Sequence, residues 1–137
     1  MNKAGNRLKE PEEVKVVGCD ETFFVSTIPA TVAQDLLLGA MGAITSKDVS
    51  KLPPDTRKKL MSYVSKKMGD LPVEESILLD NDTAIDTYCS TFTLIQLELK
   101  EIERNFGFLF DGSLQKILET MSLNTNATET SDPSSAT

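Results

Sequence analysis

Apolar residues recur with a seven-residue period across positions 83–109, TAIDTYCSTFTLIQLELKEIERNFGFL. A stripe of this kind, with charged and polar residues between its members, is typical of an amphipathic helix. The pattern therefore predicts one long helix across residues 83–109, around which we expect the rest of the chain to pack. Two series of positions form the stripe: Ile85, Phe92, Leu99 and Phe106, and, three residues later, Tyr88, Ile95, Ile102 and Leu109.

Leu94 and Leu97 lie off this stripe and make one short length of the same helix apolar on its opposite face. An apolar residue on each side of a helix needs a partner on each side. Two alternatives remain open at this point. Either other helices of the same chain cover both faces, or Leu94 and Leu97 contact another molecule.

The N-terminal part predicts a small β-hairpin. β-branched and aromatic residues are concentrated in positions 13–18 and 22–28, where we expect the two strands, and the residues between them are typical of a turn. A two-stranded ribbon is marginal in water, so we expect the hairpin to pack on helices or to pair with another copy through its edge. Residues 1–12 are polar and are expected to form a flexible leader.

Two further helices are expected in the middle of the chain. The first follows Pro29, with Thr31 as its cap, and its Gly39 and Gly42 indicate close packing, which we expect to be against the long helix. The second spans residues 54–68, begins with Pro54 and carries a basic face that we expect to be solvated. A short helical turn near Glu74 should then place the apolar residues 77–79 under the core.

The end of the predicted long helix is followed by a cluster of aromatic residues and then by a change in composition. Gly107 and Gly112 interrupt the helical period, and three phenylalanines lie nearby. These phenylalanines either belong to the core or form an exposed anchor for a partner. We expect a last helix over residues 113–121, so that residues 13–122 make a single domain, and a disordered Ser/Thr-rich tail over residues 123–137. The three phenylalanines are Phe106, Phe108 and Phe110.

The expected fold is therefore α+β and mostly helical, with a small N-terminal hairpin packed on about four helices, one of them long. The chain has 137 residues, a formal net charge of -7 and two cysteines. Counted along the sequence, residues 45–70 carry about +4 and residues 71–137 carry -9. An acidic chain disfavours nucleic acid as a partner, because phosphate binding requires lysine and arginine. The longest apolar run is far shorter than the roughly 20 residues that cross a bilayer, so no membrane segment is expected.

No group of residues in the sequence indicates a reaction. The chain has no histidine, which excludes the Ser-His-Asp and Cys-His catalytic arrangements. Asp80, Asp82 and Asp86 resemble the start of a calcium loop, but the later ligand positions do not match. Glu98 and Glu101 lie one turn apart and are expected on a solvated face. We therefore expect no enzyme, no cofactor and no metal site, and the two isolated cysteines fit a reducing cytoplasm.

Three segments together give the chain a resemblance to a known family. The hairpin ends in STIPA, a leucine-rich helix contains LLLGAMG, and the long helix leads into ERNFGFLFDGSL. In size and order of elements, residues 13–121 resemble the tail assembly chaperones of tailed bacteriophages. The long Ser/Thr-rich tail departs from that pattern. The resemblance implies a non-enzymatic protein of the host cytoplasm that binds the tape measure protein, and often the tail tube protein, before the tube polymerises.

Tape measure proteins resemble long helical rods, and keeping such a rod soluble calls for an apolar groove that accepts a helix. On the sequence, the best candidates for this partner-binding surface are Leu94, Leu97, Phe106, Phe108 and Phe110. One alternative is a structural tail or baseplate subunit that stays in the virion. Another, suggested only by the -9 of residues 71–137, is an acidic inhibitor that mimics DNA.

Overall fold

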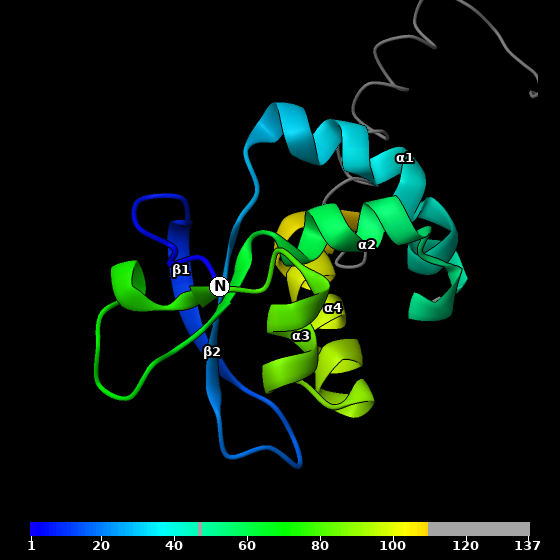
Figure 1. Ribbon diagram of the computed structural model, residues 1–137. Coiled ribbons are helices and arrows are strands. Elements are labelled where there is room, and N and C mark those ends of the chain that lie inside the picture. Colours follow the sequence, from blue (N-terminus) through cyan, green and yellow to red (C-terminus); the bar gives the residue numbers. More distant parts are fainter. Residues whose placement is uncertain (47, 110–137) are drawn as a thin grey trace, which may run out of the picture. The chain divides into compact units, whose positions relative to one another are not determined.

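The computed structural model describes residues 1–46 and 48–109, and Met1–Asn105 form one compact unit (Figure 1). The α+β fold class is confirmed, because an antiparallel sheet near the N-terminus is combined with helices, one of them long. The predicted last helix and the predicted tail lie outside the described residues. The described α-helices are α1 Ala30–Ser46, α2 Pro54–Met61, α3 Asp82–Tyr88 and α4 Thr91–Phe106, and the short 3-10 helices are η1 Val49–Lys51, η2 Val73–Glu75 and η3 Gly107–Leu109.

The predicted hairpin is present, but its first strand begins and ends earlier than the expected 13–18, and the pair belongs to a larger sheet. Strand β1, Lys9–Lys15, pairs antiparallel with β2, Thr22–Thr27. Two short strands extend this pair in the order β1-β2-β3-β4: β3 is Val64–Lys66 and β4 is Ile77–Leu78. Because a lone ribbon is marginal, β3 and β4 supply part of the pairing that the hairpin needs.

Strand β1 forms an edge of this sheet, and its sequence opposes pairing with another chain. The register with β2 shifts between Lys9 and Glu12, and Glu10 has a φ of 50°. Pro11 lies in the same irregularity and has no N–H to donate. A bulge, a proline and exposed charges are the features by which edge strands avoid association. Self-association through the hairpin edge stays a prediction, and this geometry disfavours it.

The predicted helix of residues 54–68 is correct only in its first half. Pro54 is the first residue of α2, as expected, but the helix ends at Met61. The next residues form β3, in which Val64 pairs with Val25 of β2 and every residue is buried. The pairing of a central strand has outweighed a helical pattern, because β2 would otherwise leave a row of backbone groups without partners.

Lys66 shows this tertiary effect in one side chain. It was expected on a solvated basic face, yet only 9% of the side chain is exposed, and Nζ lies 2.9 Å from Glu21 Oε1. The same ammonium lies 5.2 Å from the centre of the Tyr88 ring. An ion pair and a cation–π contact therefore offset the loss of water around this buried charge.

The prediction that residues 1–12 form a leader without a buried face is wrong. Ala4 and Leu8 are buried, and residues 9–12 belong to β1. The Ala4 N–H donates to the Ser76 carbonyl over 2.8 Å, and the Leu78 N–H donates to the Asn2 carbonyl over 2.8 Å. The N-terminus thus runs along β4 before the chain enters β1 at the opposite edge of the sheet.

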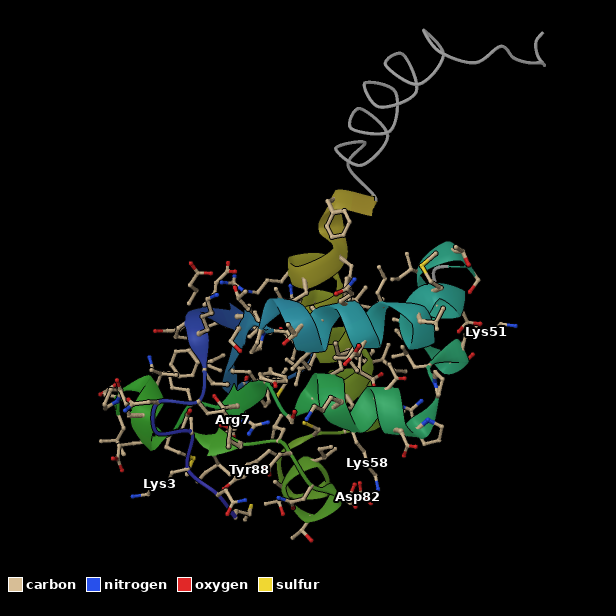
Figure 2. All side chains as sticks on the ribbon, turned by 90° about the horizontal axis from the view of Figure 1, so that it is seen from above. Lys3, Arg7, Lys51, Lys58, Asp82 and Tyr88 are labelled. Atoms are coloured by element: carbon tan, nitrogen blue, oxygen red, sulfur yellow. The ribbon has the colours of Figure 1, made fainter. Side chains whose placement is uncertain are left out.

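Arg7 fastens this crossing segment. Its Nε donates to the Ser62 carbonyl over 3.0 Å, and its guanidinium carbon lies 4.9 Å from the centre of the Tyr63 ring (Figure 2). Both partners precede β3, so Arg7 holds the N-terminal segment over the start of that strand. A sequence with few apolar residues here is ordered by hydrogen bonds and one cation–π contact.

The predicted single helix across residues 83–109 is divided into α3 and α4. Cys89 has φ -124° and ψ 130°, which is extended backbone. Ser90 then caps α4, since its Oγ accepts the Thr93 N–H over 3.1 Å. The change of direction alters which residues face inward: Ile85 is buried, whereas Phe92 and Leu99 of the same predicted stripe are exposed by 56% and 39%.

The glycines of α1 face α2 and η1, and not the long helix as expected. A Cβ built on Gly39 would lie only 2.3 Å from Thr56 Oγ1. Any residue with a side chain at position 39 would therefore prevent the two helices from approaching this closely. The helix also begins at Ala30, one residue before the predicted cap Thr31. Small residues in α1 do indicate a close neighbour, but that neighbour is α2.

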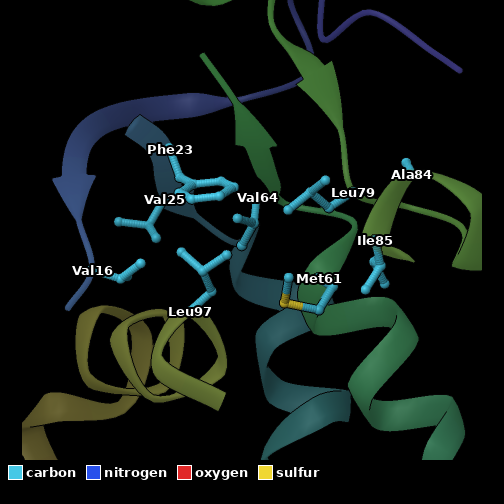
Figure 3. Close-up of a cluster of buried hydrophobic side chains, with 9 residues drawn as sticks. All are labelled: Val16, Phe23, Val25, Met61, Val64, Leu79, Ala84, Ile85 and Leu97. Atoms are coloured by element: carbon cyan, nitrogen blue, oxygen red, sulfur yellow. The ribbon is translucent and has the colours of Figure 1, made fainter. Parts of the chain in front are cut away.

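The core of this unit lies between the sheet and helices α2, α3 and α4 (Figure 3). Leu97 of α4 is fully buried there. The same chain therefore covers Leu97, but it does so with the sheet as well as with helices, and it leaves the other face of α4 exposed at Phe92 and Leu99. The cluster comprises Val16, Phe23, Val25, Met61, Val64, Leu79, Ala84, Ile85 and Leu97.

We expect Leu97→Ala to lower the free energy of unfolding by about 2–5 kcal/mol, because it removes a fully buried side chain and leaves a cavity. The matched control is Leu99→Ala on the same helix, where 39% of the residue is exposed and the loss should be clearly smaller. Denaturation in urea, followed by circular dichroism, measures both. Equal losses for the two variants would contradict the placement of Leu97 in the core.

Candidate functional site

Helix α4 is attached to the hairpin by side-chain amides that pair with backbone groups. The Val17 N–H donates to Gln96 Oε1 over 2.8 Å, and Gln96 Nε2 donates to the Val17 carbonyl over 2.9 Å. One amide side chain thus satisfies both polar groups of a single residue in the hairpin turn. The N-terminal half of α4 is fixed to this turn.

The C-terminal half of α4 binds the end of β2 in the same way. Asn105 Oδ1 accepts the Ile28 N–H over 2.8 Å, and Nδ2 donates to the Ser26 carbonyl over 3.2 Å. Glu101 Oε1 accepts the Ser26 N–H over 3.3 Å. Ser26 and Ile28 are buried, so without these contacts their backbone groups would lack partners.

Arg104 reaches across to the beginning of β1. Its Nη1 lies 2.6 Å from Glu12 Oε1, and its Nη2 donates to the Glu10 carbonyl. The contacts of Gln96, Glu101, Asn105 and Arg104 together place α4 along the length of the hairpin. A rigid helix is therefore held over the sheet by polar side chains as well as by Leu97.

Glu98 and Glu101 were expected on a solvated face, and the structure contradicts this. The Glu98 side chain is 2% exposed and Glu101 is fully buried. Glu98 Oε2 lies 2.9 Å from Arg57 Nε of α2, although the N–H is not aligned for a hydrogen bond. Burial raises the pKa of Glu98, and the adjacent Arg57 guanidinium opposes that increase. The pair is a salt bridge between α2 and α4.

Burial raises the pKa of Glu101 to about 9, since the Ser26 N–H and the Arg104 charge offset only part of the cost of an ionised carboxylate. Glu101 is therefore a neutral carboxylic acid near pH 7. Its Oε2 has no hydrogen-bond partner in the described part of the chain. A neutral carboxylic acid can act as a general acid only if a substrate can reach it. Glu101 is fully buried, so a substrate cannot.

An apolar surface is exposed where α4 meets the hairpin turn. Phe92 and Leu99 are exposed by 56% and 39%, and Val17 by 71%. The Phe92 ring lies against the turn, since a Cβ on Gly18 would be 3.8 Å from Phe92 Cδ2. Val17 is joined to the same helix through Gln96. We define Val17, Phe92 and Leu99 as the α4 surface.

The partner-binding residues expected from the sequence are separated by the structure. Leu97 lies in the core and Leu94 is half-buried against it, so neither lies on an open face. Phe106 is buried and Phe108 is 39% exposed. Phe110 lies outside the described residues. The seven-residue pattern predicted that Phe92 and Leu99 face the core, because the pattern was continued across the helix break at Ser90. In the structure both residues are exposed.

One open groove of about 430 Å³ lies between the hairpin and α4. Charged side chains line most of it, among them Glu12, Lys100 and Arg104. It is therefore unlike the apolar groove expected for a helical client. Val14 and Val25 supply its apolar part.

Within residues 1–46 and 48–109, no group of three acidic or cysteine side chains is arranged to hold a metal ion. In the same ranges, none of the helices has the length and apolar content that crossing a membrane requires. Asp80 and Asp82 instead lie at the start of α3, where Asn81 is the cap and its Oδ1 accepts the Ala84 N–H over 2.9 Å. An acidic residue in a first helical turn is stabilised by the helix dipole.

Comparison with protein-family models, with curated proteins and with solved structures finds no match.

We expect Glu101→Gln to stabilise the protein near pH 7 and to flatten its dependence on pH. The unfolded chain loses this proton near pH 4.5, whereas the folded chain keeps it to about pH 9. The contribution of Glu101 to the free energy of unfolding is therefore fully present below pH 4.5 and decreases as the pH rises toward 9. At pH 7 the decrease is about 3 kcal/mol. Glutamine keeps an acceptor for the Ser26 N–H without this cost.

Thermal melts between pH 4 and pH 9 measure the effect. The matched control is Glu103→Gln, which removes an exposed carboxylate from the same helix. Its stability should follow the wild-type pH dependence. A Glu101→Gln variant with an unchanged pH profile would show that this carboxyl is not held neutral.

Proposed function

We propose that the protein binds an amphipathic helical client on the α4 surface, and that it is a phage tail assembly chaperone whose client is a tape measure protein. The first part is supported by one observation: a phenylalanine that is 56% exposed lies on a helix fixed to the sheet by several polar contacts. Exposed aromatic residues on rigid elements are the usual anchors of protein interfaces. The second part is supported by the family resemblance described above.

The charges around the α4 surface indicate what kind of helix would fit. Asp20 follows the hairpin turn and Glu103 is one turn beyond Leu99 on α4, and both are exposed; the half-buried Lys100, beside Leu99, is the basic residue next to them. An apolar stripe with acidic groups near it is complementary to a helix whose apolar face is bordered by lysine or arginine. The proposed client segment is therefore an amphipathic helix with a basic border.

The DNA-mimic alternative has less support than it had from the sequence. It rested on the -9 of residues 71–137, but Glu98 and Glu101 in that stretch are buried. Buried carboxylates cannot imitate a line of exposed phosphates. A structural tail or baseplate subunit remains a second proposal, and the presence of the protein in purified virions would favour it.

We expect the double substitution Phe92→Asp, Leu99→Asp to weaken client binding at least about 30-fold, since truncating one interface anchor commonly costs 2 kcal/mol or more. Both side chains are already exposed, so the fold should be retained. Co-expression with the candidate tape measure protein, followed by measurement of its soluble fraction and by titration of a client peptide, tests this.

The matched control is Leu38→Asp on α1, because Leu38 is 84% exposed but lies on a different helix. This variant should bind the client as the wild type does. If the double variant is folded and still keeps the client soluble, the α4 surface is not the binding site. If the unaltered protein has no effect on any tape measure protein, the proposed client is wrong.

A further inference from the structure

Both cysteines of the chain lie at the margin of the same hydrophobic core. Cys19 follows the turn residue Gly18 in the hairpin, and Cys89 is the extended residue between α3 and α4. Each is half-buried, free, and packed against the core cluster. Two thiols that are 70 positions apart in sequence thus border one cluster.

Contacts on both sides of each cysteine bring these two segments together. Before Cys19, Gly18 faces the Phe92 ring of α4. After Cys19, Glu21 pairs with Lys66, whose ammonium lies over the Tyr88 ring next to Cys89. The turn from 18 to 21 and the junction from 88 to 92 therefore lie side by side, and Figure 1 shows both at the same end of the unit.

The electrostatics of Cys89 agree with this arrangement. Burial, followed by the negative charges of Cys19, Asp86 and Glu98 in that order, raises the pKa of Cys89 to about 12. A thiolate at Cys19 is thus close enough to Cys89 to influence the pKa of its thiol. The same high pKa keeps the Cys89 thiol protonated near neutral pH, so this thiol reacts slowly with disulfides.

We propose that Cys19 and Cys89 are a disulfide site, which oxidised glutathione or another small disulfide closes. The Cys19 thiolate attacks one sulfur of the oxidant, and one glutathione leaves as a thiolate that takes up a proton. Cys89 then gives up its proton and attacks the Cys19 sulfur of the mixed disulfide, releasing the second glutathione. Two protein thiols are oxidised, and one glutathione disulfide is reduced to two thiols.

Closing this bond would join the hairpin turn covalently to the α3–α4 junction. It would close a loop of about 70 residues, and long closed loops restrict the unfolded chain strongly. Because Val17 and Phe92 belong to the two joined segments, the bond would also fix their positions. The disulfide site does not depend on the proposed function, because it is inferred from the contacts between the two segments that carry the thiols.

The test is oxidation of the purified, fully reduced chain with oxidised glutathione at pH 8. We expect both free thiols to disappear, with no glutathione retained in the intact mass and no covalent dimer on a non-reducing gel. The midpoint of thermal unfolding should rise by roughly 10 °C and return to its starting value after reduction. Peptide mapping should recover Cys19 linked to Cys89.

Cys19→Ser and Cys89→Ser serve as matched controls. The Cys89→Ser variant should retain one glutathione at Cys19, whereas the Cys19→Ser variant should retain little, because burial keeps the remaining Cys89 thiol protonated. Wild-type protein that carries two glutathione adducts, that forms a linked dimer, or that keeps both thiols under these conditions would overturn the proposal. The measurement on the wild type is sufficient by itself if either serine variant fails to fold.

Discussion

The structure depends on one constraint, which is that the backbone at the end of β2 must be satisfied by α4. Ser26 and Ile28 are buried, and β3 pairs with β2 only as far as Val25. Beyond that point Ser26 and Ile28 find their backbone partners in Glu101 and Asn105, while Thr27 pairs with Lys9 of β1. Because an unpaired buried backbone group costs about 1–3 kcal/mol, this requirement fixes the rotation and position of α4 as firmly as Leu97 does.

The polar attachment of α4 explains the distribution of its apolar residues. The buried side of the helix contains Glu101, which contacts β2, and Glu98, which pairs with Arg57 of α2, as well as Leu97. Phe92 and Leu99 are then left on the outer side. The buried side of α4 is thus partly polar, and burying Glu101 there carries a stability cost because its carboxyl must remain neutral.

The sequence pattern was sufficient for the elements whose signals are local. The hairpin, the proline at the start of α2 and the turn near Glu74 follow from β-branched residues, Pro54 and Pro72. The N-cap of α4 was missed, because the seven-residue period continues across Ser90 and by itself predicts one helix instead of two. In the structure the Ser90 hydroxyl accepts the Thr93 N–H and starts a new helix.

Other features could not be predicted because they arise from long-range pairing. Residues 64–66 follow a helical period with α2, and only the presence of β2 as a partner makes them a strand. The first eight residues have no periodic signal, yet Arg7 and the backbone near Ala4 find partners more than 50 positions away. The burial of Glu101 likewise depends on Ser26, which lies 75 residues away in the chain.

The same reasoning bears on the kind of partner that the α4 surface can take. A helix held by Gln96 at one end and Asn105 at the other has little freedom to rearrange, so a client must fit the surface as it stands. A preformed surface saves the ordering cost that a flexible one would incur on binding. Val17, Phe92 and Leu99 are few, however, and three exposed side chains favour transient capture over a permanent interface. The proposed chaperone role, in which the client is released during assembly, would need such limited affinity.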